Sequence, residues 1–145
     1  MANGGLENDV ILVLGGTGKT GRRVADLLRQ AGQKVRIGSR TAEPRFDWQD
    51  RDSWRPALQG VKSAYIAYQP DLAAPGAPGI VESFFHQAIG CGVEKLVLLS
   101  GRGEVEAEQA ERALQATGAD WTILRASWFF QNFAEGVFVD SIAAG

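Results

Sequence analysis

The fold of this chain is decided by the stretch VILVLGGTGKTG, residues 10–21. Five consecutive apolar residues predict a buried strand, and the glycines after them predict a tight loop that opens a helix. The helix has an apolar face with spacing i, i+3, i+4, i+7, formed by Val24, Leu27, Leu28 and Ala31. Gly32 is placed to cap this helix and residues 34–38 predict a second strand, so the chain opens with a β-α-β unit.

The glycines of the loop are spaced as in phosphate-binding loops. Gly16, Gly18 and Gly21 fit the pattern G-x-G-x-x-G, and Gly15, Gly18 and Gly21 fit the looser G-x-x-G-x-x-G. In such loops the first glycine allows the turn, the middle one lets backbone approach a pyrophosphate, and the last lets helix and strand pack closely. The helix N-terminus then offers free N–H groups to the phosphates. The loop, including Thr17, Lys19 and Thr20, is therefore predicted to bind a dinucleotide. The alternative is a tight turn with a purely structural role.

Two other nucleotide-binding loops fit less well. A Walker A loop needs a glycine five positions before Gly18, and Val13 stands there. Enzymes that bind S-adenosylmethionine, like those that bind NAD, usually hold the ribose hydroxyls with an acid at the end of the second strand. Here that strand ends Gly38-Ser39-Arg40, without an acid.

This strand end favours NADP(H) over NAD(H) as the cofactor. An acidic residue would repel a 2′-phosphate, whereas the guanidinium of Arg40 attracts one and matches its geometry. Arg40 lies about twenty residues after the first glycines of the loop, where this contact is expected. Ser39 is a second candidate donor to the phosphate, and Lys19 adds a charge from the loop. The alternative is that Arg40 is an ordinary solvated residue of a turn.

The chain resembles the atypical short-chain dehydrogenases of the NmrA-like, NAD(P)H-binding type over nearly its whole length. The similarity lies in the opening loop, in FDWQD (46–50), in VEKLVLLS (93–100), in ADWTILR (119–125) and in WFFQNF (128–133). Ala126 replaces the proline usual in the family. The resemblance implies that Asp47 accepts a hydrogen bond from the adenine amino group and that Trp48 flanks the adenine ring.

The remaining pattern predicts an α/β fold: a Rossmann-type doubly wound parallel sheet with helices on both faces. The expected strand order is 3-2-1-4-5-6, with the third strand before Phe46. Later strands are expected at 62–68, 94–100 and 120–125, with helices at 51–59, 79–91 and 104–117. Residues 1–145 are expected to form one domain, with residues 1–8 as a loose leader. The resemblance also implies a C-terminal substrate subdomain that is missing from this sequence.

Composition limits the classes of partner. Fifteen basic and seventeen acidic residues give a net charge of −2, so no nucleic-acid partner is expected. No apolar run reaches membrane-spanning length, and no metal site is expected. The single cysteine, Cys91, fits a reducing cytoplasm. The expected partner is a small-molecule substrate, with a homodimer or a regulatory protein as further alternatives.

The catalytic pair of ordinary short-chain dehydrogenases, Tyr-x-x-x-Lys, is absent. Tyr65 is followed four residues later by Gln69, and the helix predicted at 104–117 holds neither Tyr nor Lys. Alcohol–ketone chemistry is therefore disfavoured, because it needs that acid. Hydride transfer to a quinone-like acceptor needs mainly two rings held face to face. The chain resembles the quinone-reductase-type members of the family most.

Candidate residues for this chemistry lie at strand ends. Tyr68 and Gln69 are expected beside the nicotinamide ribose, and Ser100 beside the nicotinamide amide or a substrate oxygen, so Ser100 and Tyr68 are the catalytic candidates. The substrate candidates are Arg102, Trp128 and Phe129. The alternative for Ser100 is an N-cap of the next helix, and for the aromatic residues it is core packing. A non-catalytic regulator that senses the redox state of NAD(P) remains the alternative function.

Overall fold

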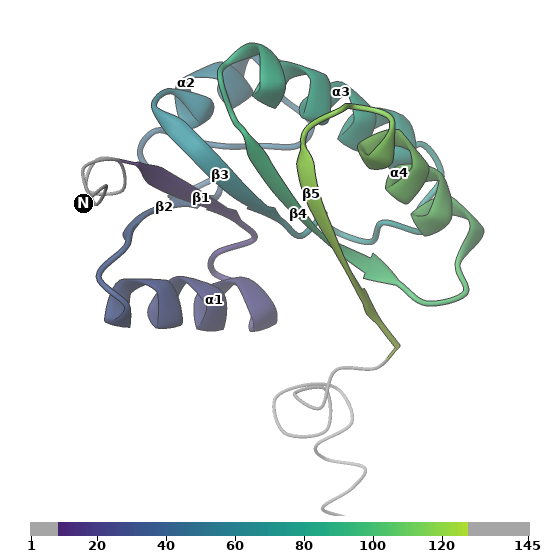
Figure 1. Cartoon of the computed structure of the whole chain (residues 1–145), viewed down its shortest axis with the longest axis horizontal. Helices are drawn as coiled ribbons and strands as arrows, with labels where there is room; N and C mark the ends of the chain where they lie inside the picture. Colours follow the sequence, from purple (N-terminus) through teal and green to yellow (C-terminus); the bar gives the residue numbers. More distant parts are fainter. Residues whose placement is uncertain (1–8, 128–145) are drawn as a thin grey trace, which may run out of the picture.

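A computed structural model describes residues 9–127 of the chain. Five parallel strands form one sheet, in the order β2-β1-β3-β4-β5 (Figure 1). The strands are β1 (Val10–Leu14), β2 (Lys34–Gly38), β3 (Val61–Ile66), β4 (Lys95–Gly101) and β5 (Asp120–Ala126). Because the strands are parallel, all their carboxyl ends lie at one edge of the sheet, and the order reverses between β1 and β3. Ligands of open α/β sheets bind at such a reversal.

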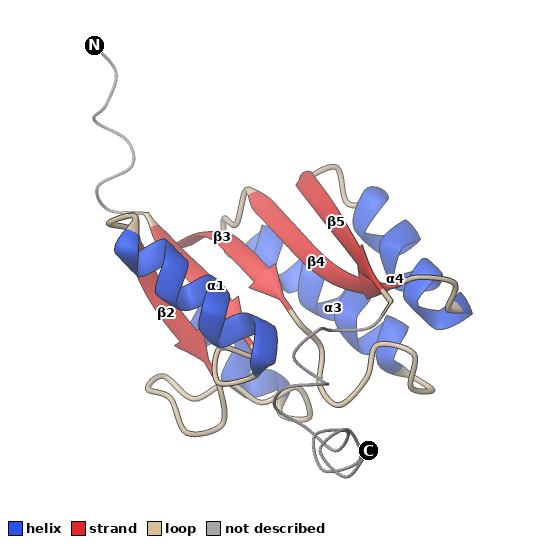
Figure 2. Cartoon of the chain, turned by 90° about the horizontal axis from the view of Figure 1, so that it is seen from below, coloured by secondary structure: helices blue, strands red, loops and turns tan. Residues whose placement is uncertain are grey.

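Helices cover both faces of the sheet, as the sequence predicted. α1 (Lys19–Gln30) lies on one face, against β1 and β2, and α3 (Ala77–Gly90) and α4 (Val105–Gln115) lie on the other (Figure 2). The short η1 (Arg51–Ser53) and α2 (Trp54–Leu58) precede β3. Left-handed glycines follow the helices, including Gly32 after α1 and Gly118 after α4, each with a φ of +77°. No helix in the described part of the chain is long and apolar enough to span a membrane.

The expected third strand is absent from the described residues, so the predicted order 3-2-1-4-5-6 is wrong by that one strand. Between Gly38 and Phe46 the chain forms only turns and bends, and Asp47 makes a single antiparallel bridge with Asp50. The reason is chain length, since a crossover between parallel strands needs about a dozen residues, usually a helix. The segment 39–45 is shorter than that. The three strands predicted at 62–68, 94–100 and 120–125 are β3, β4 and β5.

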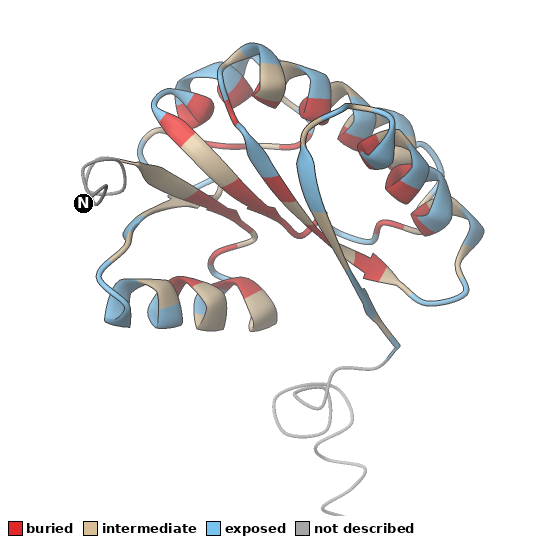
Figure 3. Cartoon of the chain, viewed as in Figure 1, coloured by how far each residue is buried: buried red, intermediate tan, exposed pale blue. Residues whose placement is uncertain are grey.

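The larger core lies between the sheet and α2, α3 and α4. It includes an aromatic cluster, defined here as Phe46, Trp48, Trp54, Tyr68 and Phe84, whose rings lie 4.9–6.5 Å from their neighbours in the cluster. A smaller core lies under α1. Burial decreases toward β5, where Trp121 and Leu124 are 41% and 47% exposed (Figure 3). Leu14 at the end of β1 and Tyr68 after β3 both belong to the larger core.

Candidate functional site

The glycine loop after β1 has the backbone geometry that its sequence predicted. Gly15 has a φ of +66°, and its carbonyl oxygen accepts a hydrogen bond from the Gly18 N–H at 2.9 Å. A Cβ on Gly21 would overlap the Gly15 carbonyl, so this glycine lets α1 pack directly against the loop. Gly18 is the N-cap of α1, so the free N–H groups of the first helical turn follow it. The loop therefore has the backbone geometry expected of a phosphate-binding loop, and phosphate binding stays a prediction.

Two hollows lie at the carboxyl edge of the sheet and meet at this loop. The first, of about 550 Å³, lies over the end of β2, and the second, of about 800 Å³, lies over the ends of β3, β4 and β5. Both are lined by Gly15, Gly18, Gln69 and Pro70. Gly15 and Gly18 of the glycine loop therefore border both hollows.

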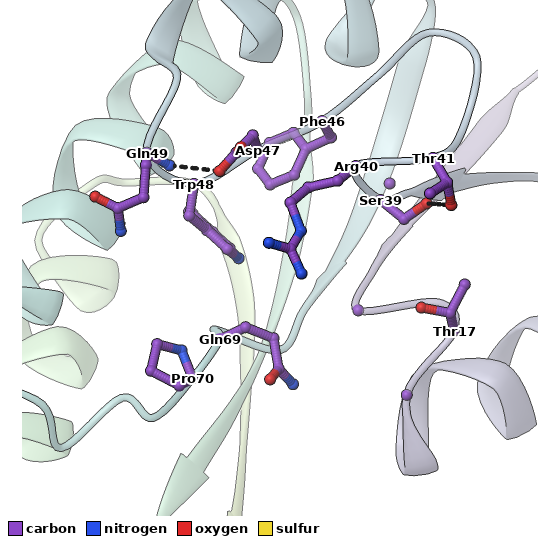
Figure 4. A pocket seen from close by; sticks show the side chains of 13 residues that line it. Thr17, Ser39, Arg40, Thr41, Phe46, Asp47, Trp48, Gln49, Gln69 and Pro70 are labelled. Carbon is purple, nitrogen blue, oxygen red and sulfur yellow. Dashed lines mark hydrogen bonds between the residues drawn. The ribbon is translucent and has the colours of Figure 1, made fainter.

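The two residues predicted to contact the 2′-phosphate, Ser39 and Arg40, line the first hollow. Arg40 follows β2, is exposed, and in Figure 4 its guanidinium points into the hollow between Trp48 and Thr17. Within residues 9–127 no hydrogen bond or ion pair engages this guanidinium. The Ser39 hydroxyl lies 3.4 Å from that of Thr41 on the rim of the same hollow. Arg40 is thus positioned to meet an anion in this hollow.

A second arginine near this hollow is already paired. Arg45 donates to Asp47 Oδ2 and to Asp50 Oδ2, both at 2.8 Å. Asp47 Oδ1 accepts the backbone N–H of Gln49 at 2.9 Å, and its side chain remains 19% exposed at the lining of the hollow. These bonds orient the Asp47 carboxylate and leave its remaining lone pairs for a ligand donor. The adenine contact of Asp47 stays a prediction.

Trp48 and Tyr68 belong first to the aromatic cluster. Both are 8% exposed, and their ring centroids lie 4.9 Å apart. Trp48 nevertheless borders the first hollow and Tyr68 borders the second. Core packing, the alternative considered for other aromatic residues, thus accounts for most of the surface of these two, and only a small part of each is accessible to a ligand.

The second hollow is lined by polar groups from several elements. Lys19 and Thr20 come from α1, Gln69 and Asp71 follow β3, and Arg102 and Glu104 follow β4. Tyr65 on β3 donates to the Thr20 hydroxyl at 3.0 Å, and burial raises the pKa of this tyrosine. Tyr65 is therefore a protonated side chain that supports the loop through Thr20, and it does not line the second hollow. The sequence did not predict that Asp71 and Glu104 line this hollow, because neither residue belongs to a recognisable motif.

Ser100 at the end of β4 lines the second hollow and is only 3% exposed. Its hydroxyl donates to Glu111 Oε1 at 2.7 Å. The same carboxylate receives the guanidinium of Arg125, at distances of 2.7–3.1 Å. Ser100 is not a helix cap, because α4 begins at Val105 with Glu104 as its N-cap. The sequence reasoning gave no role to Glu111 or Arg125, although an acid on the buried face of a helix is a readable signal.

Some predictions fall outside what the structure describes. Trp128 and Phe129, the aromatic substrate candidates, lie outside residues 9–127. Within those residues no cluster of three or more His, Cys, Asp or Glu side chains is arranged to hold a metal ion.

The parallel sheet, the strand-order reversal and the glycine loop define a Rossmann domain. Solved structures of this fold include an Escherichia coli NADPH-dependent quinone oxidoreductase complexed with NADPH, at 19% identity and a TM-score of 0.69 over 93% of this chain and 53% of that one. An Agrobacterium tumefaciens short-chain dehydrogenase/reductase with bound NAD aligns with a TM-score of 0.63 and 16% identity, over 81% of this chain and 48% of that one.

The sequence itself matches no family model, but it is similar to curated proteins. It is 33% identical to the uncharacterized oxidoreductase YesF of Bacillus subtilis, over 88% of this chain and 48% of that protein. It is 34% identical to festuclavine synthase II of Penicillium roqueforti, over 86% of this chain and 50% of that protein. The chain thus spans about half the length of the curated relatives it matches. Its sequence is thus similar to proteins named as oxidoreductases and dehydrogenases, and its fold is the Rossmann fold of solved NAD(P)-binding proteins.

Proposed function

We propose that this chain binds NADP(H) and acts as an oxidoreductase that transfers hydride to a quinone-like or other small electrophilic acceptor. One observation carries the proposal: a glycine loop with the geometry expected of phosphate-binding loops borders two hollows, and the guanidinium of Arg40 is directed into the first of them. Names of relatives support it, since YesF is called an oxidoreductase and others are called dehydrogenases. These names do not favour the redox-sensing regulator.

The residues present fit a dinucleotide at both ends. In the first hollow, Arg40 and Ser39 are the groups for a 2′-phosphate, and Asp47 and Trp48 are those for the adenine. At the junction, the backbone of Gly15 to Gly18 and the start of α1 are the groups for the pyrophosphate. In the second hollow, Tyr68, Gln69 and Ser100 border the space for the nicotinamide end. The bound cofactor would supply a hydride.

The second hollow has the character expected for an acceptor that needs little acid catalysis. Neither Tyr nor Lys stands on α4, and the Tyr65 hydroxyl, whose pKa is raised by burial, donates a hydrogen bond to the Thr20 hydroxyl. A quinone that receives a hydride becomes a delocalised anion, which then takes one proton from water. Arg102 on the rim is positioned to stabilise that charge. The chain's task is then to orient the two rings and to limit access of water.

The test is NADPH consumption by the purified chain, with and without a simple benzoquinone, with NADH in parallel. Quinone-dependent consumption that prefers NADPH is the expected result. Because the chain spans about half the length of its relatives, binding is measured separately, by titration of NADPH fluorescence. Failure to bind either nucleotide would refute the proposal at its first step.

A further inference from the structure

Glu111 stands at a position where α4 calls for an apolar residue. It is 3% exposed and shares the buried face of the helix with Ala107, Ala110 and Leu114. A buried carboxylate costs several kcal/mol unless it is paired and hydrogen-bonded. Replacing it by an apolar residue of similar volume is often neutral or stabilising in other proteins. We therefore look for a role of the Glu111 carboxylate that an apolar side chain could not perform.

The partners of Glu111 keep it ionised. Arg125 donates through Nε and Nη2, with Nη2 to Oε2 at 2.7 Å, and Ser100 donates to Oε1 at 2.7 Å. The hydrogen bonds from Arg125 lower the pKa of Glu111, with a further contribution from Ser100 against the effect of burial. An ionised carboxylate only accepts hydrogen bonds. The proton of Ser100 is therefore committed to Glu111.

The hydrogen bond from Ser100 to Glu111 determines which hydrogen-bonding groups Ser100 has left for a ligand. A serine hydroxyl has one proton and two lone pairs, and here the proton points toward α4. What remains for a group in the second hollow is an acceptor. The sequence left two partners open for Ser100, the nicotinamide amide and a substrate oxygen. A quinone oxygen only accepts, so it finds no donor at Ser100, whereas the amide nitrogen of a carboxamide carries two donor protons.

We propose that Glu111 is a positioning residue of the nicotinamide site: it holds the Ser100 hydroxyl as an acceptor, which binds the N–H of the nicotinamide carboxamide and so sets the orientation of the ring. Arg125 on β5 keeps Glu111 on α4 ionised, and Glu111 in turn orients the hydroxyl of Ser100 on β4. The inference rests on the proposed function, because it concerns the same site. It assigns the donor for the substrate oxygen to groups other than Ser100.

The test compares two ligands that differ only in this amide. NADP⁺ carries the carboxamide, and its 3-acetylpyridine analogue carries a methyl ketone that has no N–H. Dissociation constants from calorimetry give a discrimination ratio without any need for turnover. For the unmodified chain we expect NADP⁺ to bind about five- to tenfold more tightly, the worth of one hydrogen bond. Ser100→Ala should bring the ratio to about one, and Ser100→Thr, which keeps the hydroxyl, should preserve it.

Glu111→Gln should also bring the ratio toward one, because a neutral amide no longer fixes the direction of the Ser100 proton. Glu108→Gln is the matched control, since Glu108 lies on the same helix, is exposed, and pairs with Arg112 at 3.7 Å. If Glu111→Gln does not fold, Glu111→Asp keeps the charge for Arg125 but retracts it from Ser100, and should lower the ratio likewise.

The outcomes separate the two proposals. An unmodified chain that binds neither ligand overturns the proposed function and this inference with it. An unmodified chain that binds both ligands equally overturns the inference alone. A ratio that survives Ser100→Ala, or a Glu111→Gln variant that loses affinity for both ligands by the same factor, would show that Glu111 is merely structural.

Discussion

Replacing Arg40 by alanine should weaken binding of NADPH and leave binding of NADH nearly unchanged. The guanidinium follows β2, points into the first hollow, and has no other partner within residues 9–127. It therefore loses no protein contact when it turns to a ligand, and alanine removes no internal ion pair. The only difference between the two cofactors is the 2′-phosphate, so their comparison isolates this contact.

The magnitude follows from the kind of bond. A charge-assisted hydrogen bond contributes about 1–3 kcal/mol. Arg40 is exposed, so water and salt screen the attraction and the lower half of that range applies. The expected loss for NADPH is about 1–2 kcal/mol, or roughly five- to thirtyfold in the dissociation constant. The loss should shrink as ionic strength rises, because the phosphate contact is screened.

The assay is fluorescence titration of both reduced cofactors at low and at moderate salt. Arg45→Ala is the matched control, because Arg45 lies near the same hollow but is held by Asp47 and Asp50. Its loss should affect NADPH and NADH alike, through the orientation of Asp47. Equal losses for both cofactors in Arg40→Ala would refute the 2′-phosphate assignment, and a preference for NADH in the unmodified chain would refute it outright.

Three further changes test the glycine loop and the buried charge. Gly18→Val should abolish binding of both cofactors while the chain stays folded in circular dichroism. Gly18 has an ordinary φ of −84°, but an added Cβ would lie 3.2 Å from the Gly15 carbonyl oxygen, so the loop would have to shift from the geometry expected for phosphate binding; undiminished affinity would mean that no phosphate approaches there. Gly21→Ala should instead lower the free energy of unfolding by about 1–3 kcal/mol in urea, because the added methyl overlaps Gly15, and full stability would contradict the close packing of α1. Glu111→Gln should destabilise the chain at neutral pH. The lowered pKa means that the ionised pair stabilises the fold fully above the ordinary value of 4.5 and that this contribution is lost as pH falls through the folded-state pKa. The difference from the unmodified chain should therefore narrow in acid, and a constant difference would argue against a charged Glu111.

The first β-α-β unit was predictable because its signals are local. The apolar run of β1, the glycines and the apolar spacing of α1 lie within residues 10–31, and each acts on its own neighbours. The apolar face was less accurate in detail, since Leu27 is 66% exposed while Ala25 is buried. Spacing identifies a helix, but the sheet surface available to it decides which residues are covered.

The segment between β2 and Phe46 is too short for the third strand that the resemblance led us to expect. The expected third strand came from the family order, although only seven residues separate Gly38 from Phe46, namely 39–45. That length permits only turns and bends, and the single bridge, between Asp47 and Asp50, lies after this segment. As a result the first hollow is bordered by a loop pinned through Phe46 in the aromatic cluster. The loop carries Arg40 at one end and Asp47 at the other.

The two ends of the site differ in how far a sequence can predict them, and the difference is physical. The phosphate end is made of backbone, so a glycine pattern within a few residues specifies it. The nicotinamide end is made of side chains from β3, β4, α4 and β5, and Glu111 bonds to residues eleven and fourteen positions away. Spacing along one element cannot show such pairs, because they form only when the sheet brings β4 and β5 beside α4. A charged residue on a helix face that should be apolar is the one signal in the sequence that points to Glu111.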